Sequence, residues 1–179
     1  MKKLTQNILF IGLLAFTLLA CKKDQSGTIE IAIESDALTH LQADVTISDI
    51  WLNYTTKKSN SEWMKLDLVP GVYDLAHLYN NDKDTIILPA QTIEGLETFL
   101  QIRMHFGGDS TRVITMLEDT VKMTTDMSAI NGLQVAINKR SSQDKKHTLK
   151  LLIAPDSTAI HGVNPIFKPS ISLKSFTEN

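Results

Sequence analysis

The sequence has one cysteine, few aromatic residues, and no hydrophobic run long enough for a membrane-spanning helix. Because Cys21 is the single cysteine among 179 residues, no disulfide can form within the chain. Aromatic residues make up 6% of the chain, and only two of them are tryptophans. The formal net charge of −2 gives no electrostatic reason to bind nucleic acid. Because no disulfide can form within the chain, the stability of the fold must depend on its hydrophobic core.

Sequence motifs of the common enzyme classes are also missing. The chain contains no G-x-S-x-G, H-E-x-x-H, P-loop or G-x-G-x-x-G pattern. No histidine lies within four residues of another, so a metal site would need ligands from distant strands. The sequence therefore predicts neither a cofactor nor a metal site. We expect surface or turn positions for all five histidines, which are His40, His77, His105, His147 and His161.

The N-terminus has the pattern of a lipoprotein signal peptide. Lys2 and Lys3 precede an uncharged stretch over residues 8–20, whose length matches a signal-peptide core. Leu18-Leu19-Ala20-Cys21 resembles the lipobox of bacterial lipoproteins, in which cleavage follows Ala20 and the cysteine is acylated. We expect residues 1–20 to be removed and residues 21–26 to form a lipidated tether.

Two or more acyl chains hold a protein stably on a membrane. The lipid on Cys21 therefore predicts a cell-envelope location: the outer membrane, its periplasm-facing leaflet or the cell surface. The Lys-Asp run that follows Cys21 is similar to surface-export signals of Bacteroidetes lipoproteins. A solvated spacer is the alternative interpretation of this run.

Residues 27–176 alternate between apolar and polar side chains, which is typical of half-buried β-strands. The alternation occurs at 27–35, 43–56, 99–106, 132–138, 147–154 and 170–176. About nine strands with short polar turns predict a single all-β domain, a two-layer antiparallel β-sandwich of the immunoglobulin-like or transthyretin-like kind. A small β-barrel is the alternative.

Local features are expected to interrupt the strands. In 43–56 the apolar side chains change from odd to even positions after Ile47, which predicts a β-bulge near Ser48 and Asp49. Asp74 is placed to cap a short helix over 75–79, and 35–43 and 154–162 are further candidates for helical turns. The segment 107–111 is typical of a hairpin turn whose glycines adopt positive φ angles.

Several segments together resemble an uncharacterised envelope family, the domain of unknown function 4382. They are GTIEIAIESDA, ISDIWL, WMKLDL, YDLAHL, LPAQTI, FLQIRMHF, LKLLIAPDSTAI and FKPSISL, and they span about Gly27–Phe176. The most specific parts are Gln101-Ile102-Arg103 and KPSISL. The chain departs from the family at Leu38 and Gln91, where proline and glycine are usual. The resemblance implies a secreted or lipid-anchored β-sandwich and assigns no activity.

The strand 99–106 carries a candidate binding face. Gln101, Arg103 and His105 alternate with Leu100, Ile102, Met104 and Phe106, so they should share the solvent face. The planar guanidinium of Arg103 could bind a carboxylate or a sugar hydroxyl. The interpretation we prefer at this point is structural: a cross-strand ion pair of Arg103 with Glu30 or Asp67.

Two other groups of residues permit a functional and a structural interpretation. Asp74, Asp82 and Asp84 could bind calcium, but their spacing does not match a calcium loop, and a solvated turn is favoured. Exposed aromatic rings could stack on sugars, whereas buried rings would only fill the core. Core packing is favoured for Trp51, Tyr54 and Trp63.

The sequence thus predicts a non-catalytic, lipid-anchored cell-envelope module that binds or scaffolds a surface polysaccharide or a protein. The alternative is an envelope hydrolase whose site is assembled from Arg103, His105 and carboxylates of separate strands. The two hypotheses differ in whether these polar groups converge in one cleft or spread over a flat sheet face.

Overall fold

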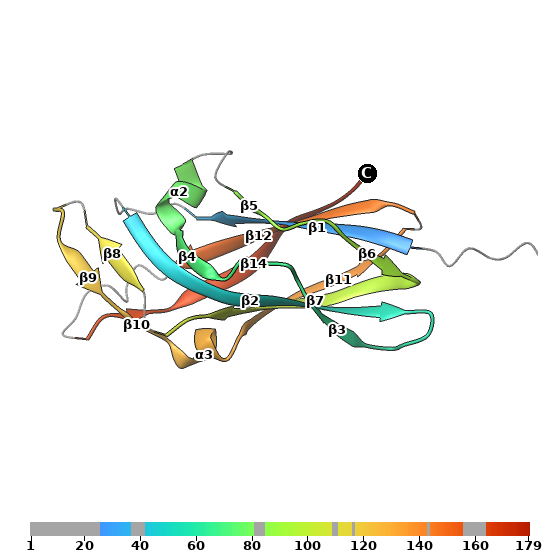
Figure 1. Ribbon diagram of the computed structural model, residues 1–179, viewed down its shortest axis with the longest axis horizontal. Helices are drawn as coiled ribbons and strands as arrows, with labels where there is room; N and C mark the ends of the chain where they lie inside the picture. Colours follow the sequence, from blue (N-terminus) through green and yellow to red (C-terminus); the bar gives the residue numbers. More distant parts are fainter. Residues whose placement is uncertain are drawn as a thin grey trace, which may run out of the picture.

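The chain folds into two β-sheets that pack face to face with the hydrophobic core between them (Figure 1). The computed structural model describes residues 26–36, 42–80, 85–108, 111–115, 117–142, 144–155 and 164–179. In these ranges the helices are limited to α2 (Leu75–Asn80) and α3 (Met127–Ile130). The predicted β-sandwich is confirmed, because the sheets formed by these residues remain two open layers.

The first layer is a five-stranded sheet of order β14-β12-β1-β5, with β6 also paired to β1. Its strands are β1 (Ser26–Ser35), β5 (Ile86–Ile87), β6 (Gln91–Glu94), β12 (Lys146–Pro155) and β14 (Pro169–Glu178). β1 and β12 run parallel along their length, with Thr28 opposite Lys146 and Ser35 opposite Ile153. The prediction of antiparallel pairing was therefore wrong for β1 and β12. The sequence did not reveal this, since side-chain alternation has the same period in parallel and antiparallel strands.

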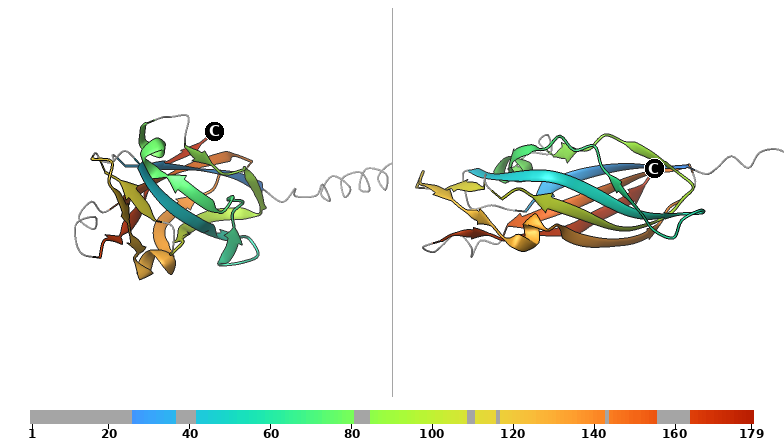
Figure 2. Two further views of the ribbon diagram at one scale, coloured as in Figure 1. Left: turned by 60° about the vertical axis from the view of Figure 1, so that its left-hand side comes forward. Right: turned by 60° about the horizontal axis from the view of Figure 1, so that its bottom comes forward.

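The second layer is a seven-stranded sheet of order β11-β7-β2-β8-β9. β7 and β8 pair with the same edge of β2, one after the other, and β3 and β4 pair with the opposite edge of β2. Its strands are β2 (Gln42–Thr56), β3 (Glu62–Lys65), β4 (Gly71–Asp74), β7 (Leu96–Phe106), β8 (Arg112–Ile114), β9 (Thr120–Lys122) and β11 (Leu133–Arg140). β10 (Thr124–Thr125) and β13 (Ile166–Phe167) form a separate parallel pair. The β8–β9 hairpin lies at the end of the sandwich opposite to the start of β1 (Figures 1 and 2).

The described residues thus form fourteen strand segments rather than about nine. The additional segments are two to four residues long, too short for alternation to identify them. The six longest expected strands all exist, as β1, β2, β7, β11, β12 and β14.

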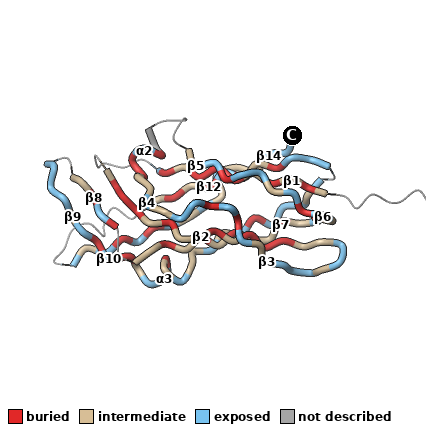
Figure 3. The backbone as a smooth tube through the Cα atoms, in the orientation of Figure 1, coloured by how far each residue is buried: buried red, intermediate tan, exposed pale blue. Residues whose placement is uncertain are grey.

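The core is made by the inward side chains of both sheets, which appear as the buried stretches of the tube in Figure 3. Alternation places every second residue of β1 and β12 there, and the side chains of Ile29, Ile31, Ile33, Leu149, Leu151 and Ile153 are all buried. From β7 the core receives Phe99, Ile102, Met104 and Phe106. Removing this apolar surface from water is the main source of stability. No disulfide within the chain adds to it, because the chain has a single cysteine.

The bulge predicted in β2 is confirmed. Ile47 pairs with Phe106 and Asp49 pairs with His105, so Ser48 is an extra residue on β2. Without the inserted residue, Ile47 and Ile50 would point to opposite sides of the sheet, because one is at an odd and the other at an even position. The insertion keeps both side chains buried. It also turns Asp49 and Trp51 away from the core, to the outward side of the seven-stranded sheet.

A second bulge, in β7, was not predicted. Gln101 pairs with Asn53 whereas Phe99 pairs with Tyr54, so Leu100 is the extra residue. Phe99 is therefore buried and Leu100 is only half-buried, contrary to the predicted inward position of Leu100. Because both side chains are apolar, the sequence did not reveal which of them enters the core.

β7 and β8 do not form the hairpin that was predicted around a turn at 107–111. β7 ends opposite Ile47, and β8 resumes along the same strand, with Arg112 opposite Asp44. The glycines of this segment are not among those with positive φ. Gly107 is required for a different reason, since a Cβ there would lie 2.7 Å from Cγ2 of Thr46. β7 and β8 are thus two strands that continue one another along β2.

The short helix after Asp74 is confirmed, with Leu75 and Leu78 buried. The Asp74 carboxylate accepts hydrogen bonds from the backbone N–H of Ala76 at 3.0 Å and of Ala43 at 2.9 Å. The other two candidate turns, at 35–43 and 154–162, lie for the most part outside the described residues. α3, which Asp126 caps through the N–H of Ser128, was not predicted.

Candidate functional site

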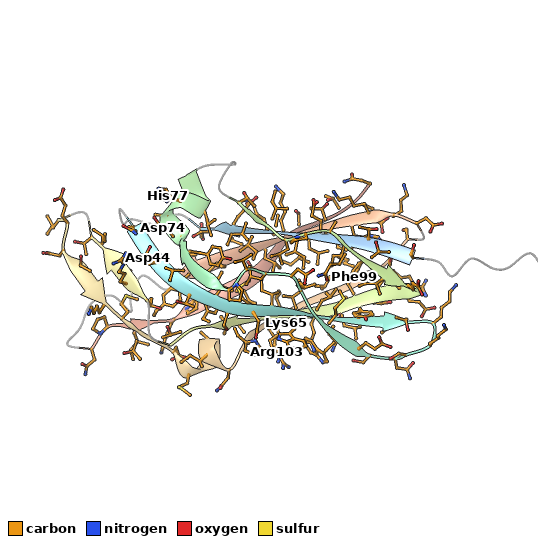
Figure 4. All side chains as sticks on the ribbon, in the orientation of Figure 1. Asp44, Lys65, Asp74, His77, Phe99 and Arg103 are labelled. Atoms are coloured by element: carbon orange, nitrogen blue, oxygen red, sulfur yellow. The ribbon has the colours of Figure 1, made fainter. Side chains whose placement is uncertain are left out.

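The outward side of the seven-stranded sheet carries a continuous group of polar and aromatic side chains. We call it the outer polar face. Four strands contribute to it: Asp49 and Trp51 from β2, Trp63 and Lys65 from β3, Gln101, Arg103 and His105 from β7, and Gln134 from β11. Lys65 and Arg103 lie on the side of this sheet that faces away from the five-stranded sheet (Figure 4).

Strand register aligns the centre of the face in one row across four strands. Lys65 pairs with Trp51, Trp51 pairs with Arg103, and Arg103 pairs with Gln134. Side chains directly opposite each other on neighbouring strands are about 5 Å apart at Cβ. The row thus places an amine, an indole, a guanidinium and an amide on the same side of the sheet.

Arg103 is held by neutral partners. Its guanidinium carbon lies 4.6 Å from the centre of the Trp63 ring. With the Gln134 amide turned so that its oxygen faces Arg103, that oxygen accepts from Nη2 at 2.8 Å and from Nε at 3.1 Å, and the amide nitrogen donates to Gln101 Oε1. The expected ion pair of Arg103 with Glu30 or Asp67 was wrong. Glu30 belongs to the other sheet and binds Lys146 at 2.9 Å.

Asp49 and His105 form the second part of the face. Nδ1 of His105 and the indole N–H of Trp51 both contact Oδ1 of Asp49, the latter at 3.1 Å. Nζ of Lys65 lies 3.8 Å from Oδ2 of the same carboxylate. Both oxygens of Asp49 thus have partners within the face, and this carboxylate orients its neighbours.

Gly132, which directly precedes β11, packs against the edges of His105 and Arg103. It has φ +99°, and a Cβ at this position would lie 2.5 Å from Nε2 of His105 and 2.8 Å from Cδ of Arg103. Only a glycine combines this backbone angle with such a close approach. The Gly132 backbone thus packs against the ring edge of His105 that carries Nε2, the nitrogen not used by Asp49.

The preferred interpretation of the tryptophans was also wrong. Trp63 is 37% exposed and Trp51 is half-buried on the outward side, so neither fills the core. Tyr54, by contrast, is buried as expected. The bulge at Ser48 explains the position of Trp51, because it places Ile50 and Leu52 inward and the residue between them outward.

The outward side of the five-stranded sheet has a different character. There Glu34 accepts from Nζ of Lys174 at 2.6 Å and of Lys150 at 3.2 Å. The hydrogen bond from Lys174, with support from Lys150, lowers the pKa of Glu34 despite its partial burial. The acidic side chains of β1 are thus matched by lysines across the sheet, which is a structural arrangement.

His147 contradicts the expectation that every histidine would be a surface or turn residue. Its ring is fully buried between Phe99 and Phe176. Nε2 lies 3.0 Å from Oγ of Ser141, and Nδ1 lies 3.5 Å from Oε1 of Glu178. Ser, His and Glu are residue types of a hydrolase triad. Nδ1 of His147, however, has no hydrogen-bond partner among the described residues, and the ring is fully buried, so the triad geometry is not formed.

The acidic turn gives no support for a calcium site. Asp74 is engaged in the helix cap and lies 3.1 Å from Nδ1 of His77, while Asp82 and Asp84 lie outside the described residues. Within the described ranges, no group of three or more His, Cys, Asp or Glu side chains is placed to hold a metal ion. The described pocket lined by Thr56, Lys57, Lys58, Glu94 and Gly95 has a volume of about 30 Å³ and contains none of the outer-face residues.

The predicted signal peptide over 1–20, with the cleavage site at Ala20 and the lipidated Cys21, lies outside the described residues, as do His40 and His161. In the part of the chain that is described, no helix has the length and apolar character required to cross a membrane.

Gln101, Arg103 and His105 were predicted from β7 alone, and the structure places all three on one face. Asp49, Lys65 and Gln134 were missed as their companions. Each alternates with apolar residues in its own strand, but only the pairing of β3, β2, β7 and β11 brings them together.

These observations define a β-sandwich with one charge-matched outer face and one open polar-aromatic face. No family model, curated protein or solved structure matches the chain.

Proposed function

We propose that the protein is a lipid-anchored cell-envelope module that binds a polysaccharide on the outer polar face. The observation that carries the proposal is the row of Lys65, Trp51, Arg103 and Gln134, with Trp63 beside Arg103. Sugars are bound by aromatic rings that contact their apolar faces and by planar groups that hydrogen-bond to hydroxyls. The row offers both kinds of group along one outer side of the sheet, across four strands, where an extended chain could bind.

A protein partner fits this surface less well. The cores of protein–protein interfaces are depleted in lysine, aspartate and glutamate, although arginine and aromatic residues are enriched there. The centre of the outer polar face, in contrast, holds Asp49 and Lys65, whose charged groups lie 3.8 Å apart. Hydroxyl-rich ligands can replace the water that these groups bind, whereas an apolar protein surface would leave them without partners.

The hydrolase alternative has less support. Asp49 and His105 pair as in a catalytic dyad, but among the described residues no hydroxyl or thiol forms a hydrogen bond with Nε2 of His105. The hydroxyl of Ser48, the neighbour of Asp49, donates to the backbone carbonyl of His105 at 3.1 Å. A histidine base needs one free ring nitrogen within reach of a nucleophile or substrate. The polar groups lie on a sheet face, which favours binding over turnover.

The envelope location rests on the sequence around Cys21, and the likeness to the domain of unknown function 4382 rests on segments within Gly27–Phe176; both stay predictions. The fold is compatible with an anchor at this end. β1 starts at Ser26 at one end of the long axis, and the outer polar face lies along the side of the sandwich (Figure 1). A tether at the end of the molecule would leave the face open to the solvent.

Replacing Cys21 by serine is expected to prevent lipidation. Because two or more acyl chains provide the membrane affinity, the variant should leave the membrane fraction, and globomycin should make the wild-type precursor accumulate. Cell fractionation with immunoblotting measures both effects. A Cys21→Ser protein that stays in the membrane fraction at wild-type levels would contradict the anchor.

Replacing Trp63 by alanine tests the polysaccharide site. We expect binding to fall by at least about tenfold, as is common when an aromatic anchor of a binding surface is truncated. Affinity electrophoresis of the full chain in detergent, against a panel of neutral and acidic polysaccharides, measures the change. The control is Leu117→Ala, a change at an exposed position 83% open to solvent beyond β8. If no polysaccharide retards the wild-type protein, the proposed function is wrong.

A further inference from the structure

The charges of the outer polar face are not balanced within the face. Asp49 contributes the negative charge, and it already has Lys65 at 3.8 Å and the ring of His105 in contact. The described partners of Arg103 are the Trp63 ring and the Gln134 amide. Of the residues that the structure describes, none places a carboxylate within ion-pair distance of Arg103. One positive charge on a central strand thus lacks a negative partner.

Among the described residues, one edge of the Arg103 guanidinium has hydrogen-bond partners and the other has none. Arginine has five N–H donors. The Nε and Nη2 donors that lie on the same edge both point to Gln134. The Nη1 and Nη2 donors on the other edge are parallel, which is the geometry that binds a carboxylate through two hydrogen bonds. Trp63 and Gln134 restrict the rotation of the side chain, so less entropy is lost when a ligand binds.

We infer that the polysaccharide is acidic, and that Arg103 binds the carboxylate of a uronic acid unit. This inference rests on the proposed function and specifies its ligand. Trp63 lies beside the guanidinium and can contact the sugar ring that carries the carboxylate. Lys65, in the same row as Arg103, adds a second positive charge for a neighbouring unit of an extended chain.

The matched sheet on the opposite side of the molecule strengthens the inference. The lysines Lys146, Lys150 and Lys174 are all engaged by Glu30 or Glu34. The same fold thus supplies carboxylate partners for its cations on one outer face. On the other face the described partners of Arg103 are neutral, and they do not bind the Nη1–Nη2 edge of its guanidinium.

The test compares acidic polysaccharides with their methyl esters, which have the same sugar backbone without the charge. Polygalacturonate, alginate and hyaluronan, each in both forms, are titrated against the full chain in detergent. We expect at least one acid to bind at least about tenfold more tightly than its ester, as is usual for a charged hydrogen bond. Arg103→Gln should remove this difference, and Arg103→Lys should restore it only in part, because lysine lacks the fork.

The control is Arg140→Gln, which removes a positive charge from an exposed position on β11 of the same sheet. It should leave the preference for the acid unchanged. Equal binding of acids and esters, or equal losses in Arg103→Gln and Arg140→Gln, would overturn the inference while polysaccharide binding itself stands. Binding to neutral polysaccharides alone would do the same. Absence of binding to every polysaccharide would overturn the proposed function as well.

Discussion

Replacing Phe99 by alanine is expected to lower the free energy of unfolding by about 3–5 kcal/mol, the range for a large aromatic truncated in a packed core. Phe99 is fully buried between the sheets (Figure 4). Its ring meets the rings of His147 and Phe176 edge to face, with centroids 5.1 and 5.6 Å away. The mutation would remove an aromatic ring that joins β7 to β12 and β14, and the remaining side chains could not fill the space.

Urea unfolding followed by tryptophan fluorescence measures this change. A domain of this size holds about 5–15 kcal/mol of stability in total, so the midpoint should move clearly. Phe99→Leu should cost less, because it leaves a smaller cavity. The control is Leu117→Ala, which should stay within about 0.5 kcal/mol. A loss below about 1 kcal/mol in Phe99→Ala would show that the ring does not join the two sheets as described.

Replacing Gly132 by alanine is expected to have two effects. A Cβ 2.5 Å from Nε2 of His105 must displace a ring that Asp49 holds at Nδ1, and alanine is strained at φ +99°. We expect a loss of about 1–3 kcal/mol in stability from strain and overpacking together. Because the same Cβ would lie 2.8 Å from Cδ of Arg103, polysaccharide binding should weaken as well.

The matched control is Gly108→Ala, whose Cβ would find its nearest neighbour at an ordinary 3.6 Å. This variant should keep both stability and binding. A double variant, Gly132→Ala with His105→Ala, removes the ring that the new methyl group meets, so the two losses should not add. Strictly additive losses would show that the cost comes from the backbone angle and the contact with Arg103, and that Gly132 does not position His105.

The arrangement of the two outer faces suggests how stability and binding are divided. The five-stranded sheet has its charges paired across strands, as in Glu34 with Lys150 and Lys174. On the outer polar face, cation–π contact and amide hydrogen bonds hold Arg103 without neutralising it. Loss of Arg103 should therefore affect binding more than stability.

Much of the fold could be predicted because alternation is a local property. The pattern of Ile29, Ile31 and Ile33 specifies a half-buried strand whatever its neighbours are, and all three side chains are buried. The phase change after Ile47 revealed the bulge at Ser48 for the same reason. The bulge at Leu100 was missed because the adjacent Phe99 and Leu100 are both apolar and either could face inward.

The sequence by itself determined the strands, the cap of α2 by Asp74 and the sharing of one face by Gln101, Arg103 and His105, since each depends on residues close together in the chain. Only the tertiary structure decided that β1 and β12 run parallel, that the Arg103 charge meets Trp63 and Gln134 instead of an acid, and that His147 is buried. The physical reason is register: contacts between strands depend on which residues lie opposite each other, and a period of two does not specify that.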